Sequence, residues 1–319
     1  MKKYDVAAMG ELLIDFTQNG YSEQGNPVFE ANPGGAPCNV LAMLQKLGRK
    51  TAFIGKVGQD GFGLQLEKAL KETGISTDGL CFDKEVHTTL AVVQKKEDGD
   101  RDFSFYRKPG ADMMLCAEEV NEDLIRNAAI FHYGSLSLTD EPVRTATVSA
   151  IEEAEKAGVL LSFDPNLRKP LWESEELAKK QIRYGLGHCH VLKISDDELV
   201  WLTGEQDYEK AIQQLRSEFP IPLILLSMGK NGSRAYCGEE TAEAPAFLSE
   251  NTIETTGAGD TFMGCMLHQI LEKGYQNLST RDMEEMLIFA NAAASIITTR
   301  RGALRVMPEE KEILKRINF

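Results

Sequence analysis

The sequence predicts an α/β fold, with a mostly parallel central sheet covered by helices on both faces and a small second sheet beside it. Over most of the 319 residues, short β-branched or apolar runs alternate with amphipathic segments of helical spacing. This alternation is typical of a parallel sheet packed between helices. Between about residues 86 and 110 it stops, because two strand-like runs flank a polar turn with little helix around them.

The first third of the chain supplies elements for both sheets. Strands are expected at residues 6–9, 28–32 and 51–57, and helices at residues 36–47 and 64–73. The runs at residues 88–94 and 102–106, joined by a polar turn at 97–100, predict a hairpin.

This hairpin has two possible partners, at residues 12–17 and 28–31. Insertions at about residues 12–33 and 86–110 would then form a lid, by which we mean a small sheet outside the main α/β unit. A chain of this length slightly exceeds the size at which one core stops growing. We therefore expect one large domain over residues 1–319 with this lid as its appendage, or two unequal domains.

From residue 128 the strand–helix alternation resumes and continues along the rest of the chain. Strands are expected at residues 130–133, 159–163, 190–194 and 223–227, and helices at 143–156, 174–186, 207–218, 259–273, 283–298 and 309–317. Ligands of such sheets bind beyond the carboxyl ends of the strands. The glycine-rich turns at those ends are therefore the first candidates for a site.

The charge balance and the cysteines exclude several classes of function. With 35 Lys+Arg against 49 Asp+Glu the net charge is −14, whereas broad nucleic-acid or anionic-membrane surfaces need clustered Lys and Arg. The six cysteines form no CxxC pair, which predicts reduced thiols. Asp5 and Glu11 interrupt the apolar stretch near the N-terminus, so no signal peptide is expected. We expect a cytoplasmic protein without nucleic-acid or membrane partners.

The strongest local motif is Gly257-Ala258-Gly259-Asp260, which follows two threonines and opens an apolar helix. Small residues before a helix leave backbone N–H groups uncrowded, and with the helix dipole these groups form an anion site. A carboxylate beside such a site suggests a general base that takes a hydroxyl proton while the turn holds a transferring phosphoryl group. The alternative is an ordinary helix start, in which Asp260 only interacts favourably with the dipole.

The second motif is the Gly34-Gly35 turn followed by Asn39. The glycines let a ligand approach the backbone closely, and the amide of Asn39 offers both a donor and an acceptor. Taken alone, an ordinary strand-to-helix turn explains this motif. No GxxxxGK[ST] sequence occurs and no GxGxxG follows a strand, so a P-loop and an ordinary dinucleotide fold both lack their signatures.

In this order, and about 220 residues apart, the two motifs resemble the signatures of ribokinase-like, PfkB-type carbohydrate kinases. The similarity covers essentially the whole chain. Residues 163–168 (Phe-Asp-Pro-Asn-Leu-Arg) and 193–198 (Lys-Ile-Ser-Asp-Asp-Glu) look most like bacterial fructokinases and the related 2-keto-3-deoxygluconate kinases. The resemblance implies a three-layer α/β/α fold with a β-sheet lid, and ATP-dependent phosphorylation of a sugar hydroxyl with Mg²⁺.

The resemblance also implies roles for individual residues. Asp260 would be the catalytic base, and the amides of Gly257, Ala258 and Gly259 would be the anion hole. The sugar would be bound by Asp15, Gly34, Gly35, Asn39, Arg107, Asp112 and Arg168. The nucleotide would be contacted by Lys193, Ser195, Ser227, Gly229, Gly232 and Asn291. Glu198 would help to hold Mg²⁺ through water. Glu254 stands where the family usually has a cation-binding Asp, so activation by K⁺ stays open.

The sugar is expected to be D-fructose, giving fructose 6-phosphate. Asp112 would suit a neutral polyol whose hydroxyls donate to it, but would repel the carboxylate of 2-keto-3-deoxygluconate. Alternatively, Asp112 pairs with Arg107 or Arg168 and never meets the sugar. A 2-keto-3-deoxygluconate kinase, another PfkB-type kinase and a non-catalytic sugar or nucleotide sensor stay open as alternatives, although the presence of Asp260 favours an enzyme. The resemblance also suggests a homodimer formed through the lid.

Overall fold

The computed structural model describes residues 2–95 and 101–318 and contains two sheets. The central sheet has nine strands in the order β13-β12-β11-β10-β9-β8-β1-β4-β5, and every pair from β11 to β5 is parallel. Its strands are β1 (Tyr4–Met9), β4 (Thr51–Gly58), β5 (Ser76–Asp83), β8 (Ala128–Gly134), β9 (Leu160–Asp164), β10 (Val191–Ser195), β11 (Leu223–Ser227), β12 (Ser233–Cys237) and β13 (Glu240–Ala244).

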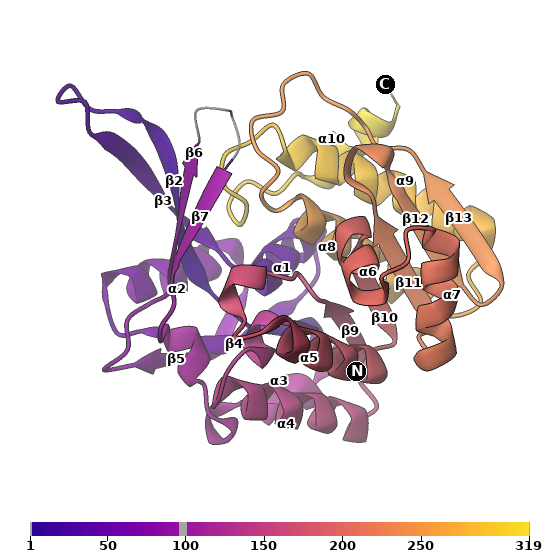
Figure 1. The fold of residues 1–319 in the computed structure, drawn as a ribbon, viewed down its shortest axis with the longest axis horizontal. Helices are drawn as coiled ribbons and strands as arrows, with labels where there is room; N and C mark the ends of the chain where they lie inside the picture. Colours follow the sequence, from indigo (N-terminus) through magenta and orange to yellow (C-terminus); the bar gives the residue numbers. More distant parts are fainter. Residues whose placement is uncertain (1, 96–100, 319) are drawn as a thin grey trace.

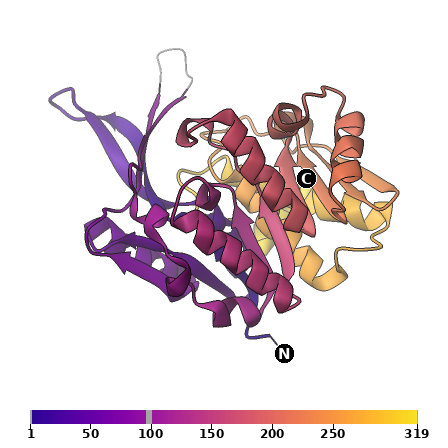
Figure 2. The ribbon, with the colours of Figure 1, turned by 60° about the horizontal axis from the view of Figure 1, so that its bottom comes forward.

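Helices cover both faces of this sheet, as Figures 1 and 2 show. One face carries α1 (Ala36–Lys46), α2 (Gly61–Thr73), α8 (Ala258–Lys273), α9 (Thr280–Ile297) and α10 (Glu310–Ile317). The other carries α3 (Glu122–Arg126), α4 (Val143–Lys156), α5 (Glu175–His188), α6 (Asp196–Thr203) and α7 (Tyr208–Glu218). Each layer has its own apolar core against the sheet. Among the described residues, no helix combines the length and the apolar character needed to cross a bilayer.

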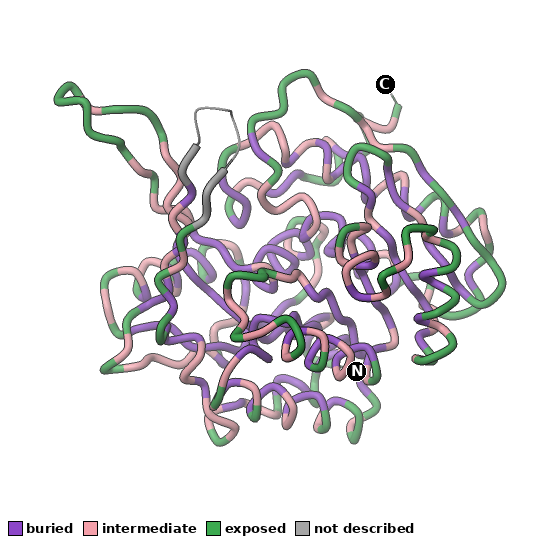
Figure 3. Tube along the Cα trace, in the orientation of Figure 1, coloured by how far each residue is buried: buried purple, intermediate pink, exposed green. Residues whose placement is uncertain are grey.

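The central strands are buried and mostly apolar because both of their faces are covered. All eight residues of β4 are buried, and β1, β9 and β10 are buried at nearly every position. Figure 3 shows these strands as the most buried part of the chain. This burial is the reason that near-continuous apolar runs, rather than alternating ones, marked the strands in the sequence.

The second sheet contains four strands in the order β3-β2-β6-β7 and stands apart from the α/β body in Figure 1. The strands are β2 (Leu13–Tyr21), β3 (Pro27–Gly34), β6 (Leu90–Lys95) and β7 (Arg101–Tyr106). Strand β2 pairs antiparallel with β3 and parallel with β6, where Asp15 lies opposite Ala91. The tip of the β2–β3 hairpin is exposed on both sides (Figure 3). We use the word lid for these four strands. The turn expected at residues 97–100 lies outside the described residues.

The α/β fold class predicted from the sequence is confirmed, but three strands were not predicted. They are β5 and β13, at the two edges of the central sheet, and β12, which lies next to β13. Strand β13 buries only Ala242 and Ala244, because one side of an edge strand faces solvent. A polar, partly exposed edge strand lacks the apolar run by which the inner strands were recognised.

Candidate active site

The carboxyl ends of the parallel strands open onto a cavity of about 240 Å³. The lid, the start of α1, the loop after β9 and the start of α8 all contribute to its wall. It is lined by Glu11, Leu13, Asp15, Gly35, Ala36, Asn39, Phe105, Leu136, Asn166, Arg168, Thr255, Thr256, Gly257, Gly259 and Asp260. The fold therefore brings the two glycine motifs of the sequence together at one cavity, which we refer to as the sugar cavity.

Asp260 lies in the first turn of α8 and is only 8% exposed. Two side-chain amides hold its carboxylate: Asn39 donates to Oδ2 at 2.8 Å and Asn166 donates to Oδ1 at 3.2 Å. The side-chain oxygen of Asn39, Oδ1, is buried and has no hydrogen-bond partner among the described residues. A buried acceptor of this kind is costly unless a ligand donates to it, so Asn39 can join the carboxylate to a bound hydroxyl.

Close contacts favour glycine at both positions of the Gly34-Gly35 turn. A Cβ placed on Gly34 would lie 2.1 Å from Oδ2 of Asp15. A Cβ placed on Gly35 would lie 2.4 Å from the carbonyl oxygen of Glu11, and Gly35 also has a φ of +120°. A side chain at Gly35 would collide with backbone, and a side chain at Gly34 would displace the carboxylate of Asp15. The carboxylate of Asp15 therefore lies directly against the backbone of Gly34, just before the start of α1.

Two acidic groups of the sugar cavity titrate abnormally. Burial raises the pKa of Asp15 to about 7; Arg168 opposes this shift, whereas Asp260 and Glu254 add to it. Burial also raises the pKa of Glu11 to about 7, although Glu11 accepts the N–H of Ala36 at 2.7 Å. With Asp260, three carboxyl groups face one small cavity, and such a lining suits hydroxyl donors.

A buried ammonium group lies at the glycine turn before α8. A Cβ on Gly259 would lie 3.1 Å from Nζ of Lys193, and Lys193 forms a 2.9 Å ion pair with Asp164. Burial by itself lowers the pKa of Lys193, but Asp164, Glu198 and Asp260 outweigh this and hold it above its usual value. Burial raises the pKa of Asp164 to about 6 despite Lys193. The turn therefore combines the backbone amides of a helix start with a retained positive charge, which together suit a phosphate.

The turn itself depends on one glycine in the left-handed conformation. Gly257 has a φ of 78°, and a Cβ there would lie 2.7 Å from the Cβ of Ala303. With Gly257 as the N-cap, α8 has no side-chain cap. The N–H of Ala258 donates to the carbonyl of Thr255 at 3.2 Å, so the amides that the turn can offer to an anion are first of all those of Gly257 and Gly259.

A second cavity, of about 530 Å³, adjoins the same turn on the side of α9. Its wall includes the predicted nucleotide residues Ser227, Gly229, Gly232 and Asn291. The amide of Asn291 is already engaged: it donates to Ala244 at 3.2 Å and accepts from Ser233 at 3.0 Å. Asn291 therefore stabilises the wall of this cavity. Phe247 and Phe262, which also line the cavity, supply apolar surfaces for a flat ring.

A third cavity, of about 440 Å³, joins the other two and contains Lys193, Ser195 and Glu198. Glu198 accepts the backbone N–H of Ser195 at 2.9 Å with one oxygen and that of Leu167 at 2.7 Å with the other. It thus completes a capping box at the start of α6, the helix-start arrangement expected of an acidic first turn. Among the described residues no cluster of three or more His, Cys, Asp or Glu could hold a metal by itself.

Glu254, the position considered for a monovalent cation, connects two loops. Its side chain is 6% exposed and accepts the N–H of Gly302 at 2.8 Å. Its own N–H donates to Thr298 at 3.2 Å. The segment before α8 is thereby joined to the segment after α9, and one carboxylate oxygen of Glu254 is occupied by that contact.

Three predicted sugar residues occupy different environments. Arg107 and Asp112 form a buried ion pair at 2.7 Å, and neither side chain lines the sugar cavity. Thr89 also donates to Asp112, and Arg107 donates to the carbonyl of Leu136 at 2.9 Å. Arg168 is exposed and lines both the sugar cavity and the third cavity. A contact of Arg107 or Asp112 with a sugar stays a prediction.

Sequence reasoning missed Glu11, Asn166 and Asp164. Glu11 follows a glycine at the end of β1, and a charged residue inside an apolar stretch was the available signal. Asn166 and Asp164 belong to the segment used only for its resemblance to fructokinases. No local pattern could reveal that Asn166 reaches Asp260 across 94 residues.

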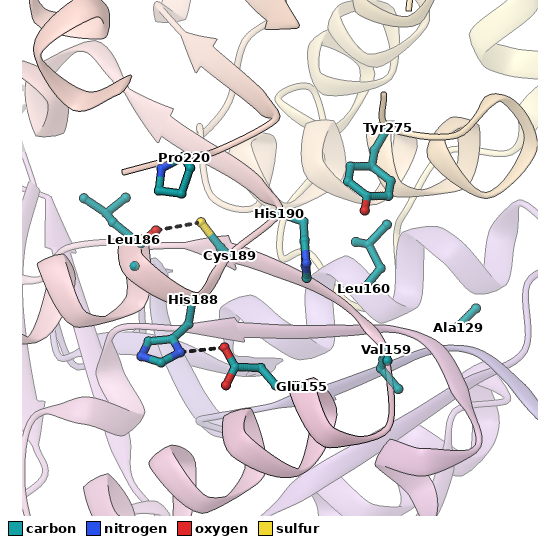
Figure 4. A pocket seen from close by; sticks show the side chains of 12 residues that line it. Ala129, Glu155, Val159, Leu160, Leu186, His188, Cys189, His190, Pro220 and Tyr275 are labelled. Carbon is teal, nitrogen blue, oxygen red and sulfur yellow. Dashed lines mark hydrogen bonds and ion pairs between the residues drawn. The ribbon is translucent and has the colours of Figure 1, made fainter. Parts of the chain in front are cut away.

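A further cavity, of about 510 Å³, lies at the other end of the parallel strands, beside the amino ends of β9 and β10 (Figure 4). His188 and Glu155 form a 2.7 Å ion pair on its wall, and the rings of His190 and Tyr275 pack edge to face. This cavity is lined by none of the residues described above. It is therefore not part of the candidate active site.

Comparison with curated proteins gives relatives over nearly the full length. Fructokinase-2 of Solanum lycopersicum is 43% identical over 313 residues, which cover 97% of this chain and 94% of the relative. Fructokinase-1 of Zea mays is 41% identical over 314 residues, covering 98% of this chain and 97% of the relative.

Solved structures give the same result for the fold. Fructokinase from Xylella fastidiosa with bound ATP has a TM-score of 0.89 at 31% identity and covers 99% of this chain and 98% of its own. Fructokinase from Vibrio cholerae O395, in a form with fructose, ADP and calcium ion bound, has a TM-score of 0.88 at 29% identity, covering 98% of both chains. The model of the pfkB family of carbohydrate kinases matches residues 3–310. The predicted family is thus confirmed, and this chain belongs to the pfkB family of carbohydrate kinases.

Proposed function

We propose that the protein transfers the γ-phosphoryl group of ATP to the 6-hydroxyl of D-fructose, giving fructose 6-phosphate and ADP. The new bond joins the sugar oxygen to phosphorus, the bond between the β-γ bridging oxygen and the γ-phosphorus breaks, and Asp260 takes the hydroxyl proton. The observation that carries the proposal is the position of Asp260, which faces the sugar cavity and lies beside the glycine turn. Fructokinases at 41–43% identity support fructose as the substrate.

Asp260 would act as the general base. Its carboxylate is oriented by Asn39 and Asn166, so that a hydroxyl in the sugar cavity can donate to it. Because phosphoryl transfer passes through a loose transition state, the proton can leave late, and a carboxylate is a sufficient base.

The anion hole would consist of the amides of Gly257, Ala258 and Gly259. They begin an α-helix without a side-chain cap, and Lys193 lies against Gly259. This fixed positive charge would stabilise the negative charge on the transferring group without reorganising.

The sugar would be held by Asp15, Asn39 and the bare backbone at Gly34 and Gly35. Asp15 belongs to the lid, so its contact with a sugar would draw the lid towards the body and exclude water from the reaction. Arg168 would face the sugar or the transferring phosphate from the rim. Arg107 and Asp112 remain in the proposal only as the buried pair that supports this part of the lid.

The nucleotide would extend from the glycine turn into the cavity beside α9. Ser227, Gly229, Gly232 and Asn291 line that cavity, while Lys193 and Ser195 line the connecting one. ATP is bound in the fructokinase of Xylella fastidiosa, and ATP with Mg²⁺ in a ribokinase-type structure from E. coli supports the same pair here.

Metal binding would depend on the phosphates. Glu198 has both oxygens engaged with backbone N–H groups, which fits a carboxylate that holds Mg²⁺ through water better than one that binds it directly. Glu254 would take part in any site for K⁺. A related fructokinase of Vibrio cholerae was solved with fructose, ADP and potassium ion. When bound, the divalent ion neutralises charge on the ATP phosphates.

A kinase for a sugar acid such as 2-keto-3-deoxygluconate is less well supported. Glu11, Asp15 and Asp260 all face the sugar cavity, and Arg168 is the only Lys or Arg among the residues described as lining it. A substrate carboxylate would therefore meet three acidic groups, and it would be repelled more strongly as Glu11 and Asp15 ionise above about pH 7. A non-catalytic sensor would have no need of Asp260 together with the complete glycine turn.

The experiment that tests the proposed function is the release of ADP from Mg-ATP with a panel of sugars. We expect turnover with D-fructose, formation of the 6-phosphate as identified by ³¹P NMR, and a lower kcat/KM for 2-keto-3-deoxygluconate. A higher kcat/KM for the sugar acid would contradict the assignment. We also propose a cytoplasmic location, which the six free thiols support.

A further inference from the structure

The carboxylate of Asp260 is held at both oxygens by residues from different parts of the chain. Asn39, which occupies Oδ2 at 2.8 Å, belongs to the first turn of α1 and to a glycine motif. Asn166, which occupies Oδ1 at 3.2 Å, comes from the loop after β9 and belongs to neither glycine motif. With only one of these donors the carboxylate could rotate about its last bond. With both, the direction of its remaining lone pairs is fixed.

The backbone of Asn166, whose side chain makes this contact, has an unusual conformation. Its φ is 48°, in the left-handed region where glycine is the least strained residue. Among the described residues only Asn277 is another non-glycine with positive φ, at 57°. Asn277 lies in an exposed loop between α8 and α9, away from every cavity of the active site. The chain thus keeps a side-chain amide at position 166 where glycine would fit the backbone better.

The same loop also reaches the proposed metal side of the site. The N–H of Leu167 donates to Glu198 at 2.7 Å, and the carbonyl of Pro165 accepts the N–H of Ser135 at 3.2 Å. Neighbouring residues of one loop therefore contact the proposed base and the proposed metal-side acid. A variant of Asn166 must consequently be tested for both effects.

We propose that Asn166 is a positioning residue for phosphoryl transfer, whose amide fixes Oδ1 of Asp260 so that the carboxylate is aimed at the sugar hydroxyl. This inference rests on the proposed role of Asp260 as the base. Asn166 takes no proton and forms no bond to the phosphoryl group. It shapes the geometry of the reacting pair, and small errors in such geometry are costly in rate.

The first test removes the amide and leaves the backbone unstrained. Asn166→Gly is compared with the matched control Asn277→Gly, which has the same residue type, the same left-handed conformation and no place in the site. We expect kcat for fructose to fall about tenfold or more in Asn166→Gly, with the KM values of fructose and ATP within about threefold of wild type. The control should keep wild-type kcat, and the two variants should have similar melting temperatures.

A second variant keeps the size of the side chain and reverses its hydrogen bonding. Asn166→Asp replaces the donor at Oδ1 with a second carboxylate beside Asp260. A neighbouring negative charge favours the protonated form of a carboxyl group. We therefore expect a larger loss of kcat than in Asn166→Gly, and an acid limb of the kcat–pH profile that moves to higher pH.

Two results would overturn the inference. One is a kcat in Asn166→Gly within twofold of wild type. The other is a loss of kcat that disappears at high Mg²⁺ concentration, because the loop would then act through Leu167 and Glu198 and not through the amide. Asp260→Asn, measured alongside, separates this inference from the proposed function. If Asp260→Asn is inactive while Asn166→Gly is fully active, only the role of Asn166 fails.

Discussion

The raised pKa values of Asp15 and Glu11 lead to a prediction about the pH dependence of sugar binding. Burial raises the pKa of both groups to about 7. Below that pH Asp15 is protonated, and above it Asp15 is ionised and can accept charge-assisted hydrogen bonds from sugar hydroxyls. Both groups therefore change charge within the range in which the enzyme is expected to work.

We predict that the KM for fructose falls by about threefold to tenfold between pH 6 and pH 8, since ionised Asp15 binds the hydroxyls more strongly. Asp15→Asn should bind fructose weakly at both pH values and lose this dependence. Steady-state kinetics at saturating Mg-ATP measure the effect. A wild-type KM that does not change across this range would contradict the role given to Asp15.

The buried pair of Arg107 and Asp112 leads to a prediction about the stability of the fold. Each side chain is only 2% exposed, so Asp112→Ala would leave a buried guanidinium without its partner. Such a loss costs about 3–5 kcal/mol of stability, and replacing both partners by apolar residues costs less. We therefore expect Asp112→Ala to lower the free energy of unfolding in denaturant far more than the double variant Arg107→Met/Asp112→Leu. If Asp112→Ala is as stable as wild type but has a raised fructose KM, Asp112 contacts the sugar after all.

At the scale of elements, the turn between β3 and α1 needs a glycine at position 34 because the side chain of Asp15 lies against it. A Cβ on Gly34 would lie 2.1 Å from Asp15, whereas a Cβ on Gly187, in α5, would meet nothing within 4 Å. We predict that Gly34→Ala displaces Asp15 and raises the fructose KM about tenfold or more, with little change in the ATP KM. Gly187→Ala serves as the control and should leave both KM values unchanged. Equal KM values in the two variants would show that Asp15 does not depend on this contact.

The sequence allowed the inner elements to be predicted because their physical signals are local. Helix α2, for example, begins at a capping Asp60 and ends at Gly74 in the left-handed conformation, and both signals lie within the helix ends. Strand β4 is buried throughout and mostly apolar because both its faces are covered. The edge strands β5 and β13 have no such local signature, since their polar residues reflect only their place at the margin of the sheet. Strand β12, between β11 and β13, is buried but too polar in sequence to be recognised.

The site was predictable to the extent that it consists of local motifs. The glycine turns carry Asp260 and Asn39 and could be recognised from spacing and resemblance. The ion pair of Lys193 with Asp164 and the contact of Asn166 with Asp260 join segments that are 29 and 94 residues apart. Such pairs result from the order of strands in the sheet, which brings the ends of β9 and β10 beside the start of α8.

At the scale of the whole molecule, the lid leaves apolar side chains uncovered. Tyr21 is 72% exposed, Val28 43% and Tyr106 65%. A cavity of about 760 Å³ beside α2 is lined on one side by Phe105 and Tyr106 of the lid. Tyr21 and Val28 lie near the tip of the β2–β3 hairpin, whereas Tyr106 lies opposite Leu90, near the start of β2. Exposed apolar groups on a protruding sheet are typical of an interface between subunits. We propose on this basis that two copies associate through their lids.

This proposal predicts a dimer whose stability depends on the lid. Val28→Glu should shift the protein to a monomer in analytical ultracentrifugation, because it buries a charge at the interface. Leu314→Glu, at a comparably exposed apolar residue of α10, should leave the dimer intact. A monomeric wild-type protein, or a Val28→Glu variant that remains a dimer, would rule out association through this surface.

The central claim is that the fold places one carboxylate, that of Asp260, between a sugar hydroxyl and a phosphate-binding turn. Asp260→Asn preserves the shape of the side chain and removes the base. The most direct measurement is kcat for fructose phosphorylation by this variant, together with calorimetric titration of fructose and ATP. We predict that kcat falls by about 10²-fold or more while both ligands still bind. A variant that retains near wild-type kcat would contradict the account.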